Sequence, residues 1–349
     1  MTTTVSPSTA TSRSRGRRLG VAAVAGLLAA TGVTTSASSA HAAPADVSAA
    51  LAEASNCKLV DYDATAYVEC VVTDSGAYTF TDIVPEPLAP HAGTSVVMTA
   101  RGGEGWATSD DWRDRTAGAG GVARTVASVD DIDEFHVYVG RDGTRGEGAA
   151  RVRGGGSSTI VSEVALEELT NIDDTYVVAG GGGARGARFK CGLTLSGAGS
   201  GGDGGVADAN HANTGNAVSG AGRDGGHGTT WACSGSQTGN PGRGGNLGVG
   251  GIQPGDRRSD GNDGIGGRGG DTHWQGNVAS DHEAGRGGAS SIWAQGGGGW
   301  GGGSAGERNG GGGGGGSYAR AVAEQLSLPR NYASTPSVTL AWPMNPPIT

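Results

Sequence analysis

The sequence is poor in the side chains that usually fill a large enzyme core. Its 349 residues include only 3 Phe and 3 Met, and aromatic residues make up 5% of the chain. Beyond the N-terminal segment no run approaches about 18 consecutive apolar residues, which excludes a protein with several membrane-spanning helices. Glycine is abundant instead: 71 residues, about a fifth of the total, against an average of about 7%.

Residues 1–42 have the three parts of a secretory signal peptide. Four arginines and no acid precede an apolar run from Leu19 to Val33, and Ala40-His41-Ala42 supplies the small-x-small cleavage pattern. A lone membrane anchor is the alternative, but the run is short for one. We therefore expect a secreted, extracellular protein with no membrane span after signal cleavage.

Removal of the signal peptide makes the chain more acidic. Cleavage before Ala43 takes away four arginines and leaves 21 basic against 34 acidic residues, so the formal net charge changes from −9 to −13. The net negative charge repels the phosphate backbone of DNA and RNA, which disfavours nucleic acid as a partner.

The four cysteines are expected to form disulfides, because an exported chain with an even number of cysteines usually pairs them. Three pairings are formally open, and we favour Cys57–Cys70 together with Cys191–Cys233. No CxxC spacing occurs, so a structural zinc site has little support. We expect no metal and no cofactor.

Glycine is unevenly distributed along the chain. Residues 43–179 contain 15 Gly, residues 180–316 contain 52, and residues 317–349 contain none. Short β-branched and aromatic runs, typical of strands, lie outside the dense block: 67–72, 77–81, 95–99, 135–139, 175–178 and 337–342. They predict one antiparallel all-β sandwich with the glycine block inserted between strands. Helices are expected only at 47–55 and at 161–169, where Ser162 precedes several acids.

Within residues 180–316, glycine repeats at every third position in several short runs. The runs start at Gly199, Gly222, Gly239, Gly261 and Gly310. Three residues per turn is the period of polyproline II, which makes no hydrogen bonds within one segment. We therefore expect a bundle of polyglycine-II-type helices, stabilised by hydrogen bonds between neighbouring segments. The alternative is a disordered glycine-rich coat or linker, which the tryptophans of this region argue against.

An ordered set of motifs supports a family resemblance. SGAYTFT, SVVMTARGGEG, FHVYVGRDG, RGGGSSTIV, TYVVAGGGGARG, GGGGGGSYA and SVTLAW follow one another along the chain. This succession resembles the glycine-rich domain of the anaplastic lymphoma kinase and leukocyte tyrosine kinase receptors and of many bacterial secreted proteins. The resemblance covers roughly residues 70–342. It implies a jelly-roll-like framework from which polyglycine helices project, and in the receptors the domain belongs to a ligand-binding ectodomain.

The resemblance and the composition together divide the chain into four parts. Residues 43–69 are an N-terminal extension, residues 70–342 are the glycine-rich β domain with its polyglycine region at 180–316, and residues 343–349 are a C-terminal tail. The signal peptide is the fourth part.

The tryptophans of the glycine block are the best candidates for ligand binding. A flat ring that rises from a surface without side chains can stack on a sugar or fill a partner's pocket. These residues are Trp231, Trp274, Trp293 and Trp300. The competing interpretation is that each ring only seals the boundary between glycines and sandwich.

No motif of a known catalytic centre is present, so we expect a protein that is not an enzyme. Acidic runs such as Asp130-Asp131 and Asp173-Asp174 are typical of solvated loops. They also leave open an extracellular hydrolase that acts on polysaccharide with paired carboxylates. The favoured function is a secreted, non-catalytic module for adhesion, extracellular binding or surface structure, with a protein or glycan partner.

Overall fold

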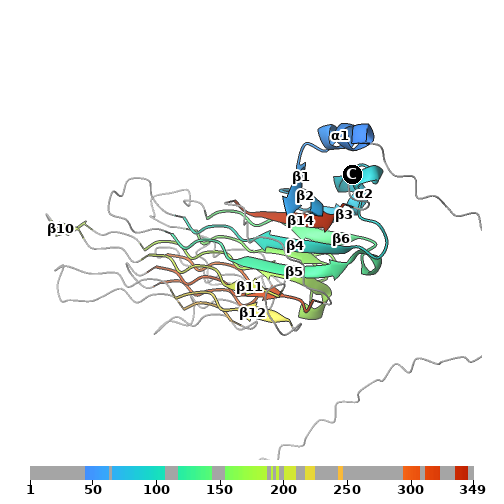
Figure 1. The fold of residues 1–349 in the computed structure, drawn as a ribbon. Helices are drawn as coiled ribbons and strands as arrows, with labels where there is room; N and C mark the ends of the chain where they lie inside the picture. The colour runs from blue at the N-terminus through green and yellow to red at the C-terminus, as the bar shows by residue number, and fades with distance from the viewer. Residues whose placement is uncertain are drawn as a thin grey trace, which may run out of the picture. The chain divides into compact units, whose positions relative to one another are not determined.

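The sequence folds into two β-sheets that continue into a bundle of glycine-rich segments (Figure 1). The computed structural model describes residues 44–62, 65–106, 117–143, 154–186, 190–191, 194–195, 200–209, 217–224, 243–246, 294–306, 311–322 and 335–344. Described strands far outnumber described helices, so the expected all-β sandwich is confirmed.

The first sheet, called sheet A, has six strands in the order β1-β2-β14-β4-β5-β11. Neighbouring strands pair antiparallel, except that β11 pairs with β5 in parallel, a departure from the expected purely antiparallel arrangement. The strands are β1 (Cys57–Tyr62), β2 (Thr65–Val72), β14 (Ser337–Pro343), β4 (Ser95–Arg101), β5 (Val122–Ser128) and β11 (Val206–Asp208).

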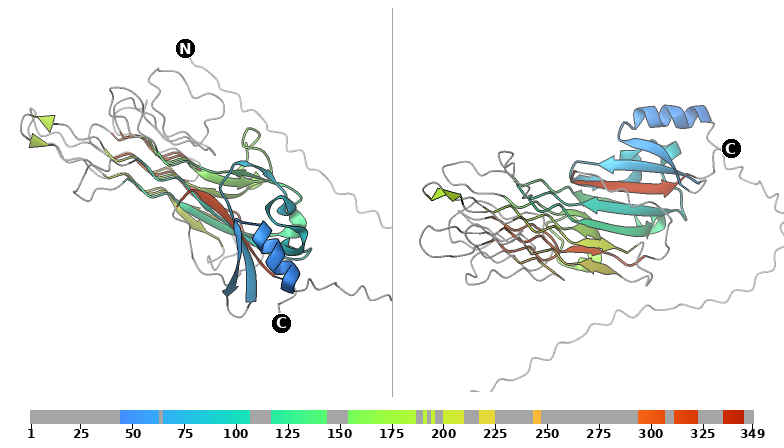
Figure 2. Two further views of the ribbon diagram at one scale, coloured as in Figure 1. Left: turned by 90° about the horizontal axis from the view of Figure 1, so that it is seen from above. Right: turned by 60° about the vertical axis from the view of Figure 1, so that its left-hand side comes forward.

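Sheet B also has six strands, in the order β12-β13-β8-β7-β6-β3, and all of its pairs are antiparallel. The strands are β12 (Val218–Gly220), β13 (Ser317–Ala319), β8 (Thr175–Ala179), β7 (Thr159–Ser162), β6 (Phe135–Tyr138) and β3 (Gly76–Tyr78). A separate two-stranded hairpin, β9 (Lys190–Cys191) with β10 (Thr194–Leu195), lies at the end of the glycine segments away from the helices (Figures 1 and 2).

The space between the sheets is filled by side chains that alternate along the strands. Val68, Met98, Phe135, Val177 and Leu340 are all fully buried there. The core is completed at one end by aromatic contacts of Trp342. Its indole Nε1 donates to the carbonyl of Leu88 at 2.9 Å, and its ring meets Phe80 edge-on at 5.8 Å.

Helical structure is scarce among the described residues and lies mainly at the end of the sandwich opposite the glycine segments (Figure 2). The expected N-terminal helix is present as α1 (Pro44–Glu53), which buries Val47 and Ala50. The other helical turns are α2 (Phe80–Ile83), η1 (Glu86–Leu88), η2 (Val129–Asp131) and η3 (Ile172–Asp174).

Two sequence-based expectations need correction. The strand expected at 77–81 ends at Tyr78, because Thr79 caps α2: its backbone N–H and its hydroxyl both donate to the Asp82 carboxylate at 2.7 Å. The helix expected at 161–169 is wrong. Val161 and Ser162 belong to β7, which is paired on both sides, and the residues after Ser162 form turns.

The disulfide between Cys57 and Cys70 is confirmed, and it joins opposite positions of β1 and β2. Strand β2 also spans residue 69, where we expected the N-terminal extension to end. Cys191 lies in β9 with its side chain outside the described residues, and Cys233 lies outside them altogether, so their pairing stays a prediction. Among the described residues no helix is long and apolar enough to cross a membrane.

Candidate functional site

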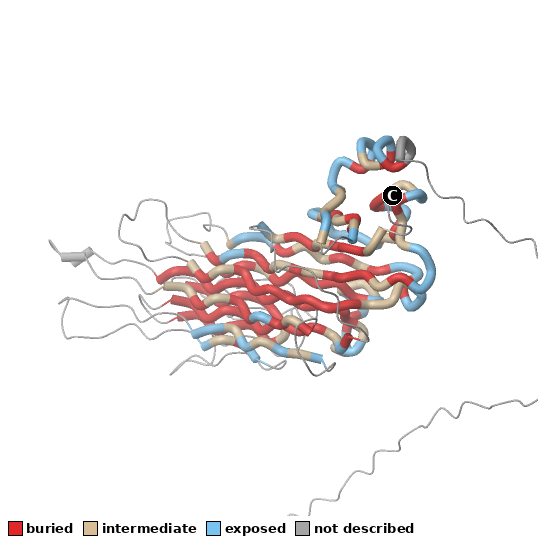
Figure 3. Tube along the Cα trace, in the orientation of Figure 1, coloured by how far each residue is buried: buried red, intermediate tan, exposed pale blue. Residues whose placement is uncertain are grey.

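Strands of both sheets run on, beyond the sandwich, into the glycine segments (Figures 1 and 3). We call the described part of these segments the glycine bundle; it comprises residues 102–106, 117–121, 140–143, 154–158, 180–186, 200–205, 220–224, 243–246, 294–306 and 311–316. The bundle therefore draws on the first half of the chain as well as on residues 180–316. Residues 180–316 lie between β8 and β13, as expected, and segments that follow β4 and β6 or precede β5 and β7 belong to the same bundle.

Each segment in the interior of the bundle donates hydrogen bonds to several neighbours. Three successive amides, Gly181, Gly182 and Gly183, donate to Gly298, Gly103 and Gly202, which lie on three different segments. In segment 311–316 the direction of the amide hydrogen bonds repeats every three residues. Its donor-to-acceptor pairs are Gly312 to Ala184, Gly313 to Ser304, Gly314 to Arg223, Gly315 to Gly181 and Gly316 to Gly301, all at 2.9 to 3.0 Å.

In that series every third amide returns to the same neighbour, since Gly312 and Gly315 both reach the segment 180–186. A flat sheet has only two such neighbours for each strand, whereas a three-residue turn points its amides in three directions. The hydrogen-bond pattern thus agrees with the glycine period in the sequence. The assignment of polyglycine-II-type helices remains our prediction from that period.

At many of its glycines the bundle leaves no room for a side chain between neighbouring segments. A Cβ atom placed on Gly118 would lie 1.9 Å from the carbonyl oxygen of Gly202, and one on Gly314 would lie 2.0 Å from that of Asp203. Real Cβ atoms essentially never approach other atoms within 3.0 Å. At these two positions glycine is therefore required by the close approach of backbones, not by a positive φ angle.

Hydroxyl side chains join the sheets to the bundle. Ser317 Oγ accepts from the Gly180 N–H at 2.8 Å and donates to the Gly205 carbonyl at 2.7 Å, so one buried side chain links three segments. Thr159 Oγ1 does the same between Gly140, whose N–H it accepts at 3.0 Å, and the Arg101 carbonyl, to which it donates at 2.6 Å. These bonds fix where the pleated strands become glycine segments.

One exposed flank of the bundle carries a row of alternating charges. Asp203 Oδ1 accepts from the Ala119 amide at 3.0 Å, and Asp224 Oδ1 accepts from the Gly244 amide at 2.9 Å. The other oxygen of each carboxylate, Oδ2, pairs with an arginine: Arg223 lies 3.4 Å from Asp203, and Arg243 lies 3.2 Å from Asp224. The four side chains are 44% to 79% exposed, so the ion pairs contribute little to stability. The main role of the two carboxylates is to accept hydrogen bonds from backbone amides at this flank of the bundle.

Of the four candidate tryptophans, Trp300 is the one among the described residues. It is half-buried, and its ring meets the ring of Tyr318 edge-on, with 5.0 Å between centroids. Its backbone N–H donates to Gly316 at 2.9 Å, and glycines flank it on both sides. The ring therefore packs against side chains of sheet B while its backbone belongs to the bundle, and its role in ligand binding stays a prediction. Trp231, Trp274 and Trp293 lie outside the described residues.

Trp300 and Tyr318 belong to a second apolar cluster, on the face of sheet B that points away from the core. Ile160, Val178, Leu169 and Tyr318 are buried in it, and Trp300 packs against them. This cluster could not be predicted from the sequence, because its members come from strands of sheet B, the glycine bundle and a loop. Nor did the sequence single out Arg320, whose side chain reaches Glu163 across 157 positions of sequence.

No family model matches the chain, and no curated protein matches it. The resemblance to the receptor glycine-rich domains accordingly stays a prediction from the motifs. Among the described residues no group of three or more His, Cys, Asp and Glu is placed to hold a metal ion.

Proposed function

We propose that the chain is a secreted, non-catalytic module that binds an extracellular protein or glycan, or forms part of a surface structure. The observation that carries this proposal is the glycine bundle. Its amides point to three neighbouring segments, so the bundle can act as a rigid support for whatever it presents. Binding functions concentrate in segments held by such supports.

Trp300 supplies the contact through which this module would recognise its partner. Its ring is partly exposed and held against Tyr318, and the residues on either side of it in the chain are glycines, which carry no side chain to obstruct a flat ligand. Stacking on the face of a sugar requires this kind of open, immobile aromatic surface. The Cys57–Cys70 disulfide and the signal-like residues 1–42 support an oxidising, extracellular location.

The proposal is tested by sedimentation of the oxidised protein with insoluble polysaccharides and cell-wall material. Trp300→Ala should weaken binding at least about tenfold, whereas Trp300→Phe, which keeps a ring, should weaken it about threefold or less. Equal binding by the wild type and Trp300→Ala would remove Trp300 from the site. Failure of the wild type to bind any glycan would leave a protein partner or a structural role as the remaining forms of the proposal.

An extracellular hydrolase acting on polysaccharide is the rival function. The same incubations distinguish it, because a hydrolase releases soluble reducing ends over time and a binding module does not. Release that a single Asp→Asn substitution abolishes would contradict the non-catalytic proposal.

A further inference from the structure

Residues 163–174, which we call the strap, form a loop that leaves sheet B at the end of β7 and returns to it at the start of β8. The loop is closed at its base by a hydrogen bond from the Glu163 N–H to the Asp174 carbonyl at 2.8 Å. Compact loops of this length whose ends meet are Ω-loops, which are often functional.

The strap is amphipathic. Leu169 is buried and Val164, Leu166 and Ile172 are partly buried against the outer face of sheet B, where they cover Ile160, Val178 and Tyr318. Its charged residues face the solvent, since Glu163, Glu167 and Glu168 are exposed. The apolar surface beneath the strap is the same cluster that Trp300 packs against.

Few polar contacts hold the strap in place. Its turns bond within themselves, with the Glu168 amide donating to Ala165 at 2.9 Å and the Leu169 amide to Leu166 at 3.3 Å. Within the described residues, the hydrogen bonds of the strap have their partners at residues 162–175, Tyr176 and Arg320. As far as the described residues show, residues 164–170 are thus attached to sheet B by apolar contacts.

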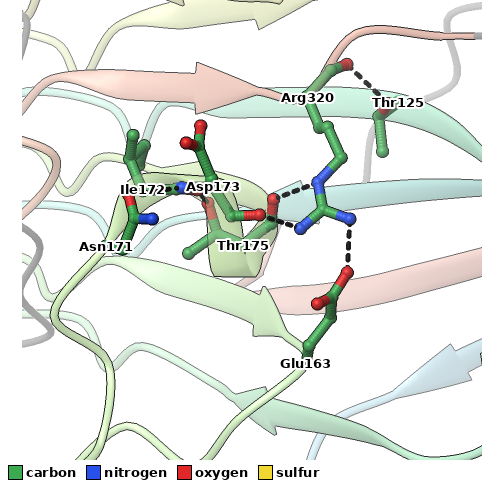
Figure 4. A network of polar contacts seen from close by, with 7 residues as sticks. All are labelled: Thr125, Glu163, Asn171, Ile172, Asp173, Thr175 and Arg320. Carbon is green, nitrogen blue, oxygen red and sulfur yellow. Dashed lines mark hydrogen bonds and ion pairs between the residues drawn. The ribbon is translucent and has the colours of Figure 1, made fainter. Parts of the chain in front are cut away.

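Arg320 fastens the two ends of the strap together (Figure 4). Its guanidinium donates to the Glu163 carboxylate at one end and to the Asp173 carbonyl at the other, while Nε donates to the Thr175 carbonyl at 2.9 Å. The backbone of Arg320 is fixed independently, because its carbonyl accepts from the Thr125 hydroxyl at 2.8 Å and its amide donates to Tyr176 at 2.9 Å. The guanidinium also lies 4.5 Å from the centre of the Tyr176 ring.

We propose that the strap is a lid that opens as a unit while both sheets stay folded, that Arg320 is its latch, and that opening uncovers the apolar face of sheet B beside Trp300. A segment that makes few contacts outside itself and is closed at its base can open at a lower free energy than the sheets. The uncovered surface is rich in Ile, Val and Tyr side chains, and it enlarges the aromatic surface that Trp300 presents. This inference goes beyond the proposed function, and its test needs no ligand.

Hydrogen exchange of the oxidised full chain, followed by mass spectrometry, tests the lid. In the wild type, peptides covering 163–174 should exchange at least about tenfold faster than those covering β7 and β8. In Arg320→Met, which keeps the apolar stem but removes the donors, the strap should exchange about tenfold faster again, with β7 and β8 unchanged. Arg223→Met, which removes an exposed arginine of the bundle flank, is the matched control and should leave the strap unchanged.

Exposure of the apolar face beside Trp300 is measured by acrylamide quenching of tryptophan fluorescence. The contribution of Trp300 is the difference in fluorescence between each protein and the same protein carrying Trp300→Phe. Quenching of that signal should rise in Arg320→Met. If Arg320→Met does not fold, Glu163→Gln weakens the same latch from the exposed side and carries the same expectations. Exchange of the strap at the rate of β7 and β8, an unchanged strap in the latch variant, or unchanged quenching would each overturn the proposal.

Discussion

Adding a single methyl group inside the glycine bundle should destabilise the protein strongly, and Gly314→Ala is the sharpest case. Gly314 lies in the buried segment 311–316, and its amide donates to Arg223 at 2.9 Å. The added Cβ would lie 2.0 Å from the carbonyl oxygen of Asp203 and 2.4 Å from its carbon, both of them backbone atoms. No side-chain rotation can relieve such a contact.

The cost follows from the displacement that the methyl group forces. To bring 2.0 Å up to the 3.0 Å minimum, segments 311–316 and 200–205 must separate by about 1 Å. That stretches two bonds between them, Gly202 to Gly312 at 2.8 Å and Gly205 to Gly315 at 3.0 Å, past the hydrogen-bonding range. Two lost bonds at about 1 kcal/mol each and an overpacking cost of about 1–3 kcal/mol exceed the roughly 0.4–1 kcal/mol that alanine gains by restricting the unfolded chain. The net loss is about 2–5 kcal/mol.

Chemical denaturation followed by circular dichroism measures this loss directly. Gly76→Ala is the matched control, because its Cβ would lie 3.5 Å from the nearest atom, in the Tyr78 side chain, which is an ordinary contact. We expect Gly76→Ala to change the free energy of unfolding by less than about 0.5 kcal/mol. If Gly314→Ala is as stable as Gly76→Ala, the backbones of the bundle are not in contact and the reasoning fails.

Three further predictions concern the junction, the core and the disulfide. Ser317→Ala should cost about 1–3 kcal/mol in denaturation experiments, because it leaves the Gly180 amide and the Gly205 carbonyl without their buried partner; a neutral effect would contradict the linking role. Burial, and secondarily the Glu163 charge, raises the pKa of Tyr176 from 10.0 to about 12. The buried phenol of Tyr176 is harder to ionise in the folded state than in the unfolded state. The stability that the neutral phenol contributes is therefore present in full below pH 10 and is lost as the pH rises to about 12. The wild type should therefore lose about 2–3 kcal/mol more than Tyr176→Phe over that range, and parallel pH profiles would refute the assignment. Replacing Cys57 and Cys70 together by alanine should lower the free energy of unfolding by about 3 kcal/mol, as loop-closure entropy predicts for 13 residues of separation; an unchanged melting temperature would show that the β1–β2 pairing alone restrains the chain.

The strands of the framework could be predicted where β-branched and aromatic residues form short runs. Strands β2, β4, β6, β8 and β14 all contain such runs, and each lies close to its expected range. Strand β5 was missed because Arg124 and Thr125, both buried, interrupt its apolar pattern. The helix at 161–169 was expected because Ser162 precedes acids as a helix cap would. Sheet pairing on both sides of β7 outweighs that local signal.

The bundle could be predicted only in part. The glycine repeat indicates how many residues make one turn, but it does not indicate which segments of the chain pack side by side. Glycine at every third position indicated three-directional bonding within 180–316. It gave no sign that short segments such as 102–106 and 117–121 join the same bundle. Those contacts depend on which strands the segments prolong, which is a property of the whole fold. The Arg320 latch has the same origin, since β13 carries Arg320 to a loop far away in sequence.

Hydrogen bonds between backbone amides and carbonyls hold the glycine segments together as a rigid bundle. The most direct test is hydrogen exchange by NMR on oxidised protein labelled with ¹⁵N-glycine alone, which reports on amides such as Gly181, Gly183, Gly202 and Gly315. Each of these donates to a carbonyl on another segment at 2.7 to 2.9 Å. We predict exchange at least about a thousandfold slower than in an unfolded chain, comparable to the amides of the sheets. Exchange at the rate of free glycine peptides would contradict the account.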